Sequence, residues 1–439
     1  ITKTIPSQAF ENCVSITSLN IPEGVTEISS YAFSGCKNLT SVTLPRSLSK
    51  IGSGAFNRSE NLSEIHISDI AAWCKIEFRG HPLRHDNALL YLEGELIRDV
   101  VVPEGVTEIA AVAFLGCKSL TSITLPQSLR KIGNGAFDGC INLSSLMIPE
   151  GVTEIPPRAF LNCKKLSTIP LPKSLRKIGE RAFEGCSSLS SLTIPKGVTE
   201  IAPGAFKDCQ NLESILLPLC LLKIEENIFE GCVSLSWLII PDGVTEIAER
   251  AFKKCYNFTS ITLPKSLRKI GEFSFSSCKK LSEVHISDIA TWCSIEFNSN
   301  PLEYAKSLYL NGELVKNLVI PEGVTEIASK AFLNCTSLTS ITLPKSLRKI
   351  GGGAFKGCGN LHEIIIPEGV TEIGDRAFWG CESLTSITLP KSLRKIGGGA
   401  FKGCESLQEI IVPNGEIYSL VMKYQDSAKK KYKLILLQH

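Results

Sequence analysis

The chain has 439 residues, of which 43% are hydrophobic and 21% charged, and its 47 basic and 44 acidic residues give a formal net charge of +3. This apolar fraction supports a buried core along the whole chain. A charge so close to balance leaves no large surface of one sign, so we expect neither nucleic acid nor an anionic membrane as a partner. No apolar stretch is long enough to cross a membrane, so direct insertion is not expected.

A repeat of 23 residues runs through the chain, and successive copies differ in the sign of their charges. Residues 103–109 read PEGVTEI and residues 126–132 read PQSLRKI; residues 149–155 again read PEGVTEI and residues 172–178 read PKSLRKI. A fixed period of this length is typical of a solenoid, in which each coil buries its apolar face against its neighbours.

One coil is represented by residues 338–358, LTSITLPKSLRKIGGGAFKGC. The alternation predicts a short strand that ends at Pro344, with Ser340 and Thr342 facing outward, then a second short extended segment and a tight or 3₁₀-like turn. The positions expected to face inward are Leu338, Ile341, Leu343, Leu347, Ile350, Ala354, Phe355 and Cys358.

Charge alternates at one position from coil to coil. The column is Glu108, Lys131, Glu154, Lys177, Glu200, Lys223, Glu246 and Lys269. Stacked strands lie about 4.8 Å apart, so unlike charges would meet at each step, and a slip by one coil would set like charges together. We therefore interpret this column as a device that fixes the register rather than as a binding surface.

Fourteen of the 17 cysteines lie three residues after a repeat phenylalanine, from Cys13 and Cys36 to Cys381 and Cys404. Cysteines at one periodic position cannot form disulfide bonds between distant loops, so we predict a column of buried free thiols. A spacing of 23 residues is also far from the spacing that brings thiolates around one zinc ion.

The spaced Leu, Ile, Pro, Leu, Ile, AF and GC of these copies resemble the bacterial BspA-like leucine-rich repeats, from residue 1 to about 413. The resemblance implies a right-handed leucine-rich repeat superhelix with short parallel strands and tight turns. It also implies an association with secreted or cell-surface proteins that bind ligands on host or neighbouring cells. It implies no catalytic residues, because the family motif is a scaffold motif.

Two coils, at about residues 66–102 and 285–320, break the pattern in the same way. HISDIAAWCKIEF begins the first and HISDIATWCSIEF the second, 219 residues later. The pair Asn311-Gly312, and more weakly Glu93-Gly94, predict a tight hairpin in each. We infer an internal duplication, and we interpret the recurring tryptophans Trp73 and Trp292 as core packing.

The first irregular coil also holds four side chains of metal-ligating type: Cys74, His81, His85 and Asp86. The second copy has Asn300, Tyr304 and Ala305 in place of the last three, so we expect no metal site there. His66 and His285 recur, and we interpret them as solvated surface histidines without a partner.

Outward positions of the first strand are mainly Ser and Thr, as at Ser41 and Thr43, Ser122 and Thr124, Ser191 and Thr193, Ser260 and Thr262, Ser340 and Thr342, and Ser386 and Thr388. Leu216, Trp237 and Ile239 occupy these positions instead, with Met147 on the same column. An exposed apolar cluster with an aromatic centre is typical of a partner-binding hot spot. The alternatives are that another segment of the chain covers the cluster, or that the copies have drifted neutrally. Ile365 and Ile411 repeat the substitution and define a second predicted patch.

The repeat stops after Pro413, so we divide the chain into a solenoid over residues 1–413 and a C-terminal cap over residues 414–439. A helical face is formed by Ile417, Leu420, Val421, Tyr424 and Ala428, and Tyr432 to Leu437 reads as a strand. A helix over the last coil would shield an open sheet edge. We take this end as a natural terminus, and the start at Ile1, within a repeat, as the mark of a fragment or processed form.

The sequence offers no catalytic signature: it lacks a GxSxG elbow, a HExxH helix and a phosphate-binding glycine loop. We therefore predict a non-enzymatic protein without cofactor or metal, extracellular or at the cell surface, that binds a protein or glycan through its strand face. Two alternatives stay open. The chain could be an intracellular protein interaction scaffold, which the unpaired thiols favour, or a passive spacer for a domain absent from it.

Overall fold

The computed structural model describes residues 3–82, 88–423 and 433–436. These residues form 37 short strands and four helices, which divide into two compact units. The first unit holds residues 1–220 and 227–234, and the second holds residues 221–226 and 235–439. Each unit is a stack of coils joined by parallel strand pairs, and each is described below by itself.

Each regular coil contributes one strand to each of two parallel ladders. In the coil that begins at Leu338, β30 (Ser340–Thr342) buries Ile341 and exposes Ser340 and Thr342, and β31 (Lys349–Ile350) buries Ile350. These expectations are confirmed, except that Leu343 is half-buried rather than sealed. The turn after β31 passes close to the preceding coil, and a Cβ on Gly351 would lie 2.5 Å from the backbone nitrogen of Ser329. Glycine is required there because no side chain fits.

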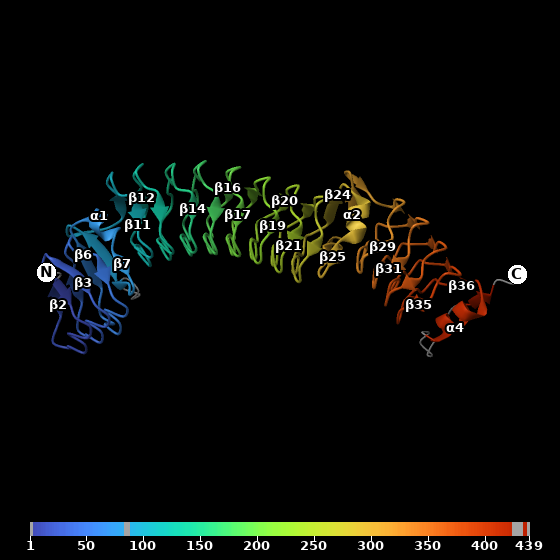
Figure 1. The fold of residues 1–439 in the computed structure, drawn as a ribbon, viewed down its shortest axis with the longest axis horizontal. Helices are drawn as coiled ribbons and strands as arrows, with labels where there is room; N and C mark the ends of the chain where they lie inside the picture. The colour runs from blue at the N-terminus through green and yellow to red at the C-terminus, as the bar shows by residue number, and fades with distance from the viewer. Residues whose placement is uncertain (1–2, 83–87, 424–432, 437–439) are drawn as a thin grey trace. The chain divides into compact units, whose positions relative to one another are not determined.

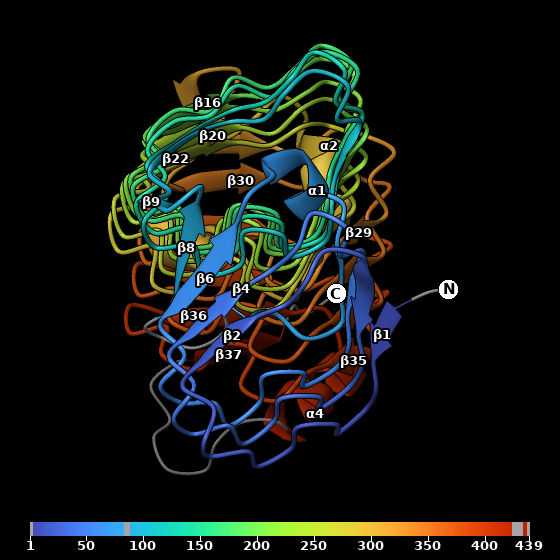
Figure 2. The same ribbon diagram turned by 90° about the vertical axis from the view of Figure 1, so that its left-hand side faces the viewer.

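The first ladder of the first unit begins with a five-stranded sheet that Figure 2 shows with β2, β4, β6 and β8 side by side. Its strands are β2 (Ser18–Asn20), β4 (Ser41–Thr43), β6 (Glu64–Ile67), β8 (Leu89–Leu92) and β9 (Glu95–Leu96). The ladder continues in the pairs β10 (Asp99–Val101) with β12 (Ser122–Thr124) and β16 (Ser191–Thr193) with β18 (Ser214–Leu216).

The second ladder of this unit has shorter strands. Its first sheet comprises β1 (Lys3–Ile5), β3 (Val25–Ile28), β5 (Lys50–Ile51) and β7 (Glu77–Phe78). It resumes with β11 (Glu108–Ile109) and β13 (Lys131–Ile132), and then with β14 (Glu154–Ile155), β15 (Lys177–Ile178) and β17 (Glu200–Ile201).

The second unit repeats this plan (Figure 1). One ladder comprises β20 (Trp237–Ile239), β22 (Ser260–Thr262), β24 (Glu283–Ile286), β26 (Leu308–Leu310) and β27 (Glu313–Leu314), then β28 (Asn317–Val319), β30, β32 (Glu363–Ile365), β34 (Ser386–Thr388), β36 (Glu409–Val412) and β37 (Lys433–Leu436). The other comprises β19 (Lys223–Ile224), β21 (Glu246–Ile247), β23 (Lys269–Ile270) and β25 (Glu296–Phe297), then β29 (Glu326–Ile327), β31, β33 (Glu372–Ile373) and β35 (Lys395–Ile396).

The phenylalanines stack along the core. The rings of Phe114 and Phe137 have centroids 5.4 Å apart and planes inclined by 2°, and those of Phe137 and Phe160 repeat this distance at 0°. All three side chains are fully buried. Burial at every coil, rather than at one centre, is what stabilises a repeat protein of this kind.

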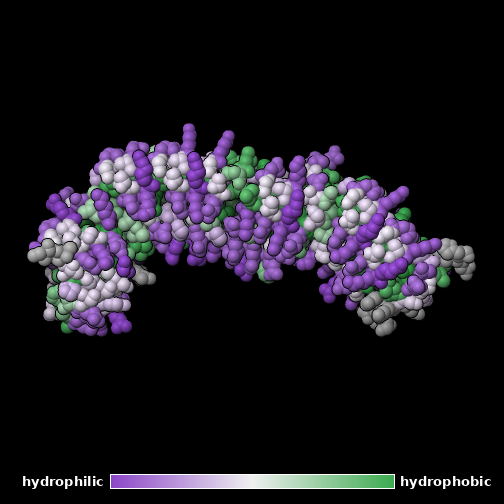
Figure 3. Space-filling model, viewed as in Figure 1, coloured by the Kyte–Doolittle hydropathy of each residue, from purple (hydrophilic) through white to green (hydrophobic). Residues whose placement is uncertain are grey.

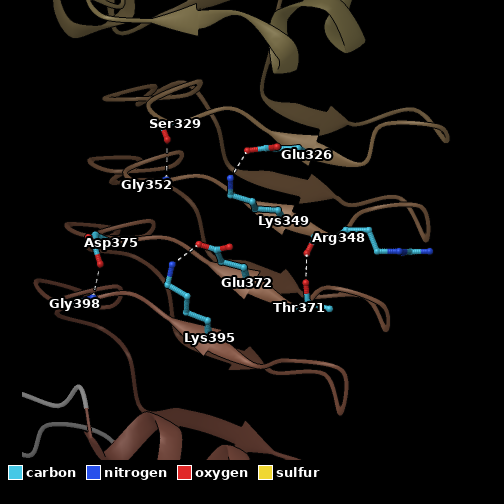
Figure 4. Close-up of polar contacts among 10 residues, drawn as sticks. All are labelled: Glu326, Ser329, Arg348, Lys349, Gly352, Thr371, Glu372, Asp375, Lys395 and Gly398. Carbon is cyan, nitrogen blue, oxygen red and sulfur yellow. Dashed lines mark hydrogen bonds and ion pairs between the residues drawn. The ribbon is translucent and has the colours of Figure 1, made fainter.

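The charged column lies in the predicted register. Glu372 is the direct partner of both Lys349 and Lys395 across β31, β33 and β35. Lys349 Nζ lies 2.7 Å from Glu326, and Lys395 Nζ lies 2.8 Å from Glu372 (Figure 4). The surface over β19, β21 and β23 is accordingly hydrophilic (Figure 3).

A second acidic position joins coils through the backbone, which the sequence interpretation missed. Glu150 accepts hydrogen bonds from the backbone N–H groups of Lys173 and Ser174, at 3.0 and 3.2 Å. The first of these bonds is the main reason that the pKa of Glu150 is lowered, and Glu104 and Glu322 show the same arrangement.

The two irregular coils carry the predicted hairpins. Tyr309 pairs with Leu314 in antiparallel β26 and β27, and Tyr91 pairs with Leu96 in β8 and β9. Each coil also has a short helix that the sequence interpretation missed: α1 (Ile70–Trp73) and α2 (Ile289–Ser294), followed by α3 (Leu302–Ala305) in the second coil.

The C-terminal segment contains α4 (Gly415–Lys423) and β37. Strand β37 continues the sheet by pairing with β36, so the predicted helix and strand are confirmed where the structure describes them. Ile417 and Val421 are buried on the helical face. The predicted face residues Tyr424 and Ala428 lie outside the described residues.

Candidate binding surface

The outward side chains of one sheet in the second unit form two rows. Across β20, β22, β24 and β26, Ile239 pairs with Thr262, Thr262 with His285, and His285 with Tyr309. We call this line, with its neighbouring row of Trp237, Ser260 and Glu283, the β20–β26 face. Adjacent rungs of a sheet lie about 4.8 Å apart, so the four residues of the longer row span about 14 Å.

Trp237 and Ile239 are the apolar members of the β20–β26 face. Trp237 is 50% exposed and Ile239 is 58% exposed, whereas Leu238 between them is buried. Alternation along β20 points one side chain inward and two outward, and here the outward pair is apolar. The structure therefore places both residues where the sequence interpretation put them, on the surface.

A polar and aromatic cluster lies on the same sheet. His285 Nε2 is 3.0 Å from a carboxylate oxygen of Glu283, and the imidazole stacks on the Tyr309 ring with centroids 4.7 Å apart. The expectation that this histidine has no partner is wrong. The contact with Glu283 could have been read from the sequence, because residues two apart on a strand share one face. The contact with Tyr309 could not, because the tyrosine comes from the next coil.

The matching sheet of the first unit has the same cluster without the apolar pair. His66 Nε2 lies 3.1 Å from Glu64 and its ring stacks on Tyr91 at 4.8 Å, so the expectation is wrong for this histidine too. Strand β2 of the first unit corresponds to β20 of the second, but its outward residues are the polar Ser18 and Asn20. The duplicated halves thus differ at the position that the sequence analysis singled out.

The other predicted contact residues are distributed over both units. In the first unit Leu216 is 68% exposed and Met147 is 67% exposed, and Leu216 pairs with Thr193. Since Leu216 and Trp237 belong to different units, their joint cluster stays a prediction. In the second unit Ile365 is 74% exposed. Ile411 was predicted to be exposed but is half-buried. Its direct partner in β37 is Ile435, so this strand covers it on one side.

The recurring tryptophans belong to the core, as predicted. Trp73 and Trp292 are each 1% exposed, and their indole N–H groups donate to the carbonyls of Ala113 and Ala331 at 2.9 Å. Among the described residues no group of three or more His, Cys, Asp and Glu is placed to hold a metal ion.

His81 takes part in this packing. Its Nε2 lies 3.2 Å from the Ala113 carbonyl, and burial lowers the pKa of this histidine to about 3. His85 and Asp86, the other two members of the set weighed as ligands, lie outside the described residues.

The cysteines are free thiols, and most are buried. At most places in the periodic column the thiol donates to the carbonyl of the phenylalanine one coil earlier, as from Cys140 to Phe114 and from Cys186 to Phe160, both at 3.1 Å. Cys117 and Cys335, which follow the irregular coils, contact Ser119 and Ser337 instead. Desolvation raises the pKa of the Cys140 and Cys186 thiols. The column is therefore a hydrogen-bonded structural feature.

These coils define the class of protein as a leucine-rich repeat solenoid. A model of the BspA type leucine rich repeat region matches residues 3–78, 91–213, 199–308 and 303–427. The chain belongs to this BspA-type family, and the resemblance seen in the sequence is confirmed.

The chain is also similar to solved structures. A leucine-rich repeat protein from Bacteroides ovatus ATCC 8483 is 31% identical, with a TM-score of 0.58; the match covers 77% of this chain and 92% of that one. A leucine rich cell surface protein from Faecalibacterium prausnitzii A2-165 is 25% identical over 94% of this chain and 92% of that one, with a TM-score of 0.35. No curated protein matches the chain. Across the described residues, no helix is both long enough and apolar enough to span a membrane.

Proposed function

We propose that this chain is a non-enzymatic binding protein of the cell surface or extracellular space, which contacts a protein or glycan of a host or neighbouring cell through the β20–β26 face. Family membership supports the setting, because BspA-type repeats are associated with surface proteins. The observation that carries the proposal is the exposure of Trp237 and Ile239 at positions where other coils carry Ser or Thr.

The composition of the β20–β26 face suits recognition. Protein interfaces combine an aromatic or aliphatic anchor with a polar rim, and tryptophan and tyrosine are enriched among the residues that contribute most to affinity. Trp237 and Ile239 supply the anchor, and Glu283 and His285 supply hydrogen-bonding groups within the same sheet. Tyr309 adds a second aromatic ring beside the histidine.

The experiment is a binding screen of the full chain against a glycan array and a panel of extracellular matrix proteins. The double variant Trp237→Ser/Ile239→Thr restores the residue types of other coils and is expected to weaken binding at least about tenfold. Val101→Thr is the matched control, because it removes another exposed apolar side chain from a strand face, in the first unit. Ile365→Thr tests the second predicted patch.

Equal thermal unfolding of all variants would show that any loss comes from the surface and not from the fold. A double variant that binds like the parent would refute the assignment of the site to the β20–β26 face. A parent chain that binds nothing in the screen, under conditions in which known binders of the panel respond, would count against the binding role and favour the spacer alternative.

A further inference from the structure

The second ladder of the second unit is interrupted at the irregular coil. One sheet ends with β25 and the next begins with β29. A pocket of about 660 Å³ lies at this break, and residues of α2, β25 and the β29 coil line it. We call this pocket the β25–β29 pocket. Its volume falls within the range of about 300–1,000 Å³ that is usual for ligand sites.

The helix of the irregular coil causes the break. In the regular ladder Gly374 donates its backbone N–H to Ile350 of the preceding coil at 2.8 Å. Ala328, the matching residue of the β29 coil, donates instead to the carbonyl of Cys293 in α2, at 2.7 Å. The helix thus takes a bond that would otherwise close the ladder, and Cys293 lines the pocket.

Both strand edges that border the pocket are suited to pairing. In a parallel ladder successive residues of a strand point their N–H and C=O groups alternately toward the preceding and the following coil. The N–H groups of Thr371 and Gly374, for example, donate to the carbonyls of Arg348 and Ile350 in the preceding coil. The edges of β25 and β29 that face the pocket therefore each present both N–H and C=O groups. A sheet edge of this kind accepts an extended peptide through main-chain hydrogen bonds.

The pocket interrupts the alternation of charge. In the regular coils of this ladder glutamate and lysine rungs alternate, but here Glu296 of β25 is followed by Glu326 of β29. Each keeps a lysine only on its far side, Lys269 at 3.7 Å from Glu296 and Lys349 at 2.7 Å from Glu326. Glu322 also lines the pocket, and its described lining includes no basic residue.

The first irregular coil shows what the second one lacks. It keeps the three matching glutamates, Glu77, Glu104 and Glu108, but it carries Lys75 and Arg79 where the second has Ser294 and Asn298. Arg79 Nε lies 2.7 Å from the Glu77 carboxylate. The first copy therefore supplies a cation beside Glu77, whereas the second has Ser294 and Asn298 at these two positions. The second copy carries Lys330 in place of Val112, and its Nζ lies 3.4 Å from the Asn298 carbonyl at the border of the pocket rather than between Glu296 and Glu326.

We infer that the β25–β29 pocket binds an extended segment of a partner protein that carries a lysine or arginine. The segment pairs with the edges of β25 and β29 as an added strand, and its cation lies between Glu296 and Glu326 as the missing basic rung. This site is separate from the β20–β26 face, so each can be tested without the other.

The test measures fluorescence anisotropy of a labelled peptide, acetyl-Thr-Val-Thr-Lys-Thr-Val-Thr-amide, with the full chain. Two reference peptides replace the lysine with glutamine or N-methylate the backbone on either side of it. The variant Ser294→Lys/Asn298→Arg carries the residues of the first copy. The variant Ser340→Lys/Thr342→Arg adds the same charge to the strand face, outside the pocket, and serves as the control.

The lysine peptide is expected to bind the parent and the control variant, and to bind at least about tenfold more weakly to Ser294→Lys/Asn298→Arg, with an unchanged melting temperature. Both reference peptides are expected to bind the parent at least about tenfold more weakly than the lysine peptide does. The inference is overturned if the lysine peptide does not bind the parent, or if the glutamine peptide or the pocket variant binds equally well. Displacement of the peptide by spermidine or calcium chloride at concentrations near the peptide's own Kd would show a site for small cations and would overturn strand pairing.

Discussion

The periodic cysteine is a hydrogen-bond donor as well as a small apolar group. Ser59 occupies the same position in one coil and donates its hydroxyl to the Phe33 carbonyl at 2.9 Å, as the thiols do to theirs. It is completely buried. What the position requires is therefore a small side chain that can donate a hydrogen bond to the carbonyl of the preceding coil.

Replacement of Cys186 tests this requirement. Cys186→Ser keeps a side-chain donor for the Phe160 carbonyl, whereas Cys186→Val removes it and leaves that carbonyl only the backbone N–H of Cys163. We expect the valine variant to lose about 0.5–1.5 kcal/mol of unfolding free energy, the usual contribution of one hydrogen bond, and the serine variant to lose clearly less. Urea unfolding of the three proteins measures both values. A serine variant that is the less stable of the two would show that apolar character, and not the donor, decides the position.

Thiol reactivity should follow exposure. Cys220 is exposed and Cys13 is half-buried, whereas the other fifteen of the 17 cysteines are buried. Titration of the native chain with dithionitrobenzoate is expected to show one fast thiol and one slower one, and all 17 after denaturation. Loss of the fast phase in the Cys220→Ser variant would identify Cys220 as the fast thiol. Several fast thiols in the native chain would contradict the buried column.

Single residues were predictable where they break a pattern. The exposure of Trp237 and Ile239 followed from their outward position in a strand that ordinarily carries Ser or Thr. The partners of His285 did not follow, because the stacking of Tyr309 depends on the length of the hairpin coil that brings it alongside. The exposed position of a side chain can be read from one coil, whereas its contacts require two.

The strand ladders show at the scale of elements how charge specifies register. Glu372 lies between two lysine rungs, and its pKa is lowered mainly by its hydrogen bond to Lys395. Exposed pairs of this kind contribute little individually. Their combined effect is on which coil lies next to which, because a shift by one coil would oppose like charges.

Reversal of one rung tests the ladder. Glu372→Lys places three lysines in succession with Lys349 and Lys395, and we expect a small fall in melting temperature that shrinks as salt screens the repulsion. Glu372→Gln, which removes the charge without reversing it, should lie between this variant and the parent. Melting curves at about 20 mM and about 500 mM NaCl distinguish these outcomes. A fall that is the same at both concentrations would show that charge is not its cause.

Short helices and the β25–β29 pocket were not predictable from the repeat. The segment 285–297 was recognised as irregular, but α2 forms because Asp288 accepts the backbone N–H of Thr291 at the start of a turn. This is an ordinary helix cap, and its sequence signal is a single residue. The pocket then depends on which ladder bond the helix replaces, and only the folded coil reveals that.

At the scale of the whole chain, the buried thiols make stability depend on alkaline pH. Burial raises the pKa of Cys74, Cys278 and Cys293 to about 12. In the unfolded chain a cysteine titrates near about 8.5, so the folded state holds protons that the unfolded chain releases. This stabilisation is complete below about pH 8.5 and is lost as the pH rises toward 12.

We therefore expect a melting temperature that is level between about pH 6.5 and 8 and falls progressively above about pH 9. Differential scanning calorimetry across this range measures it. Cys220→Ser should follow the same curve as the parent, because that thiol is exposed. A melting temperature that stays level to about pH 10.5 would contradict burial of the thiols.

The leucine-rich repeat fold was predictable because one coil, once understood, is repeated along both units, and the family match confirms it. The division into a solenoid over residues 1–413 and a cap over 414–439 remains a prediction. Function was predictable only in outline, because the repeat describes the scaffold, and any ligand must be recognised by the few side chains that depart from it.

Acrylamide quenching of tryptophan fluorescence tests most directly that Trp237 is a contact residue. Trp73 and Trp292 are sealed in the core, so in a Trp379→Phe variant Trp237 is the accessible fluorophore. We predict efficient quenching in the free protein and strong protection when a ligand from the binding screen is added. Quenching that the bound ligand leaves unchanged would contradict the account.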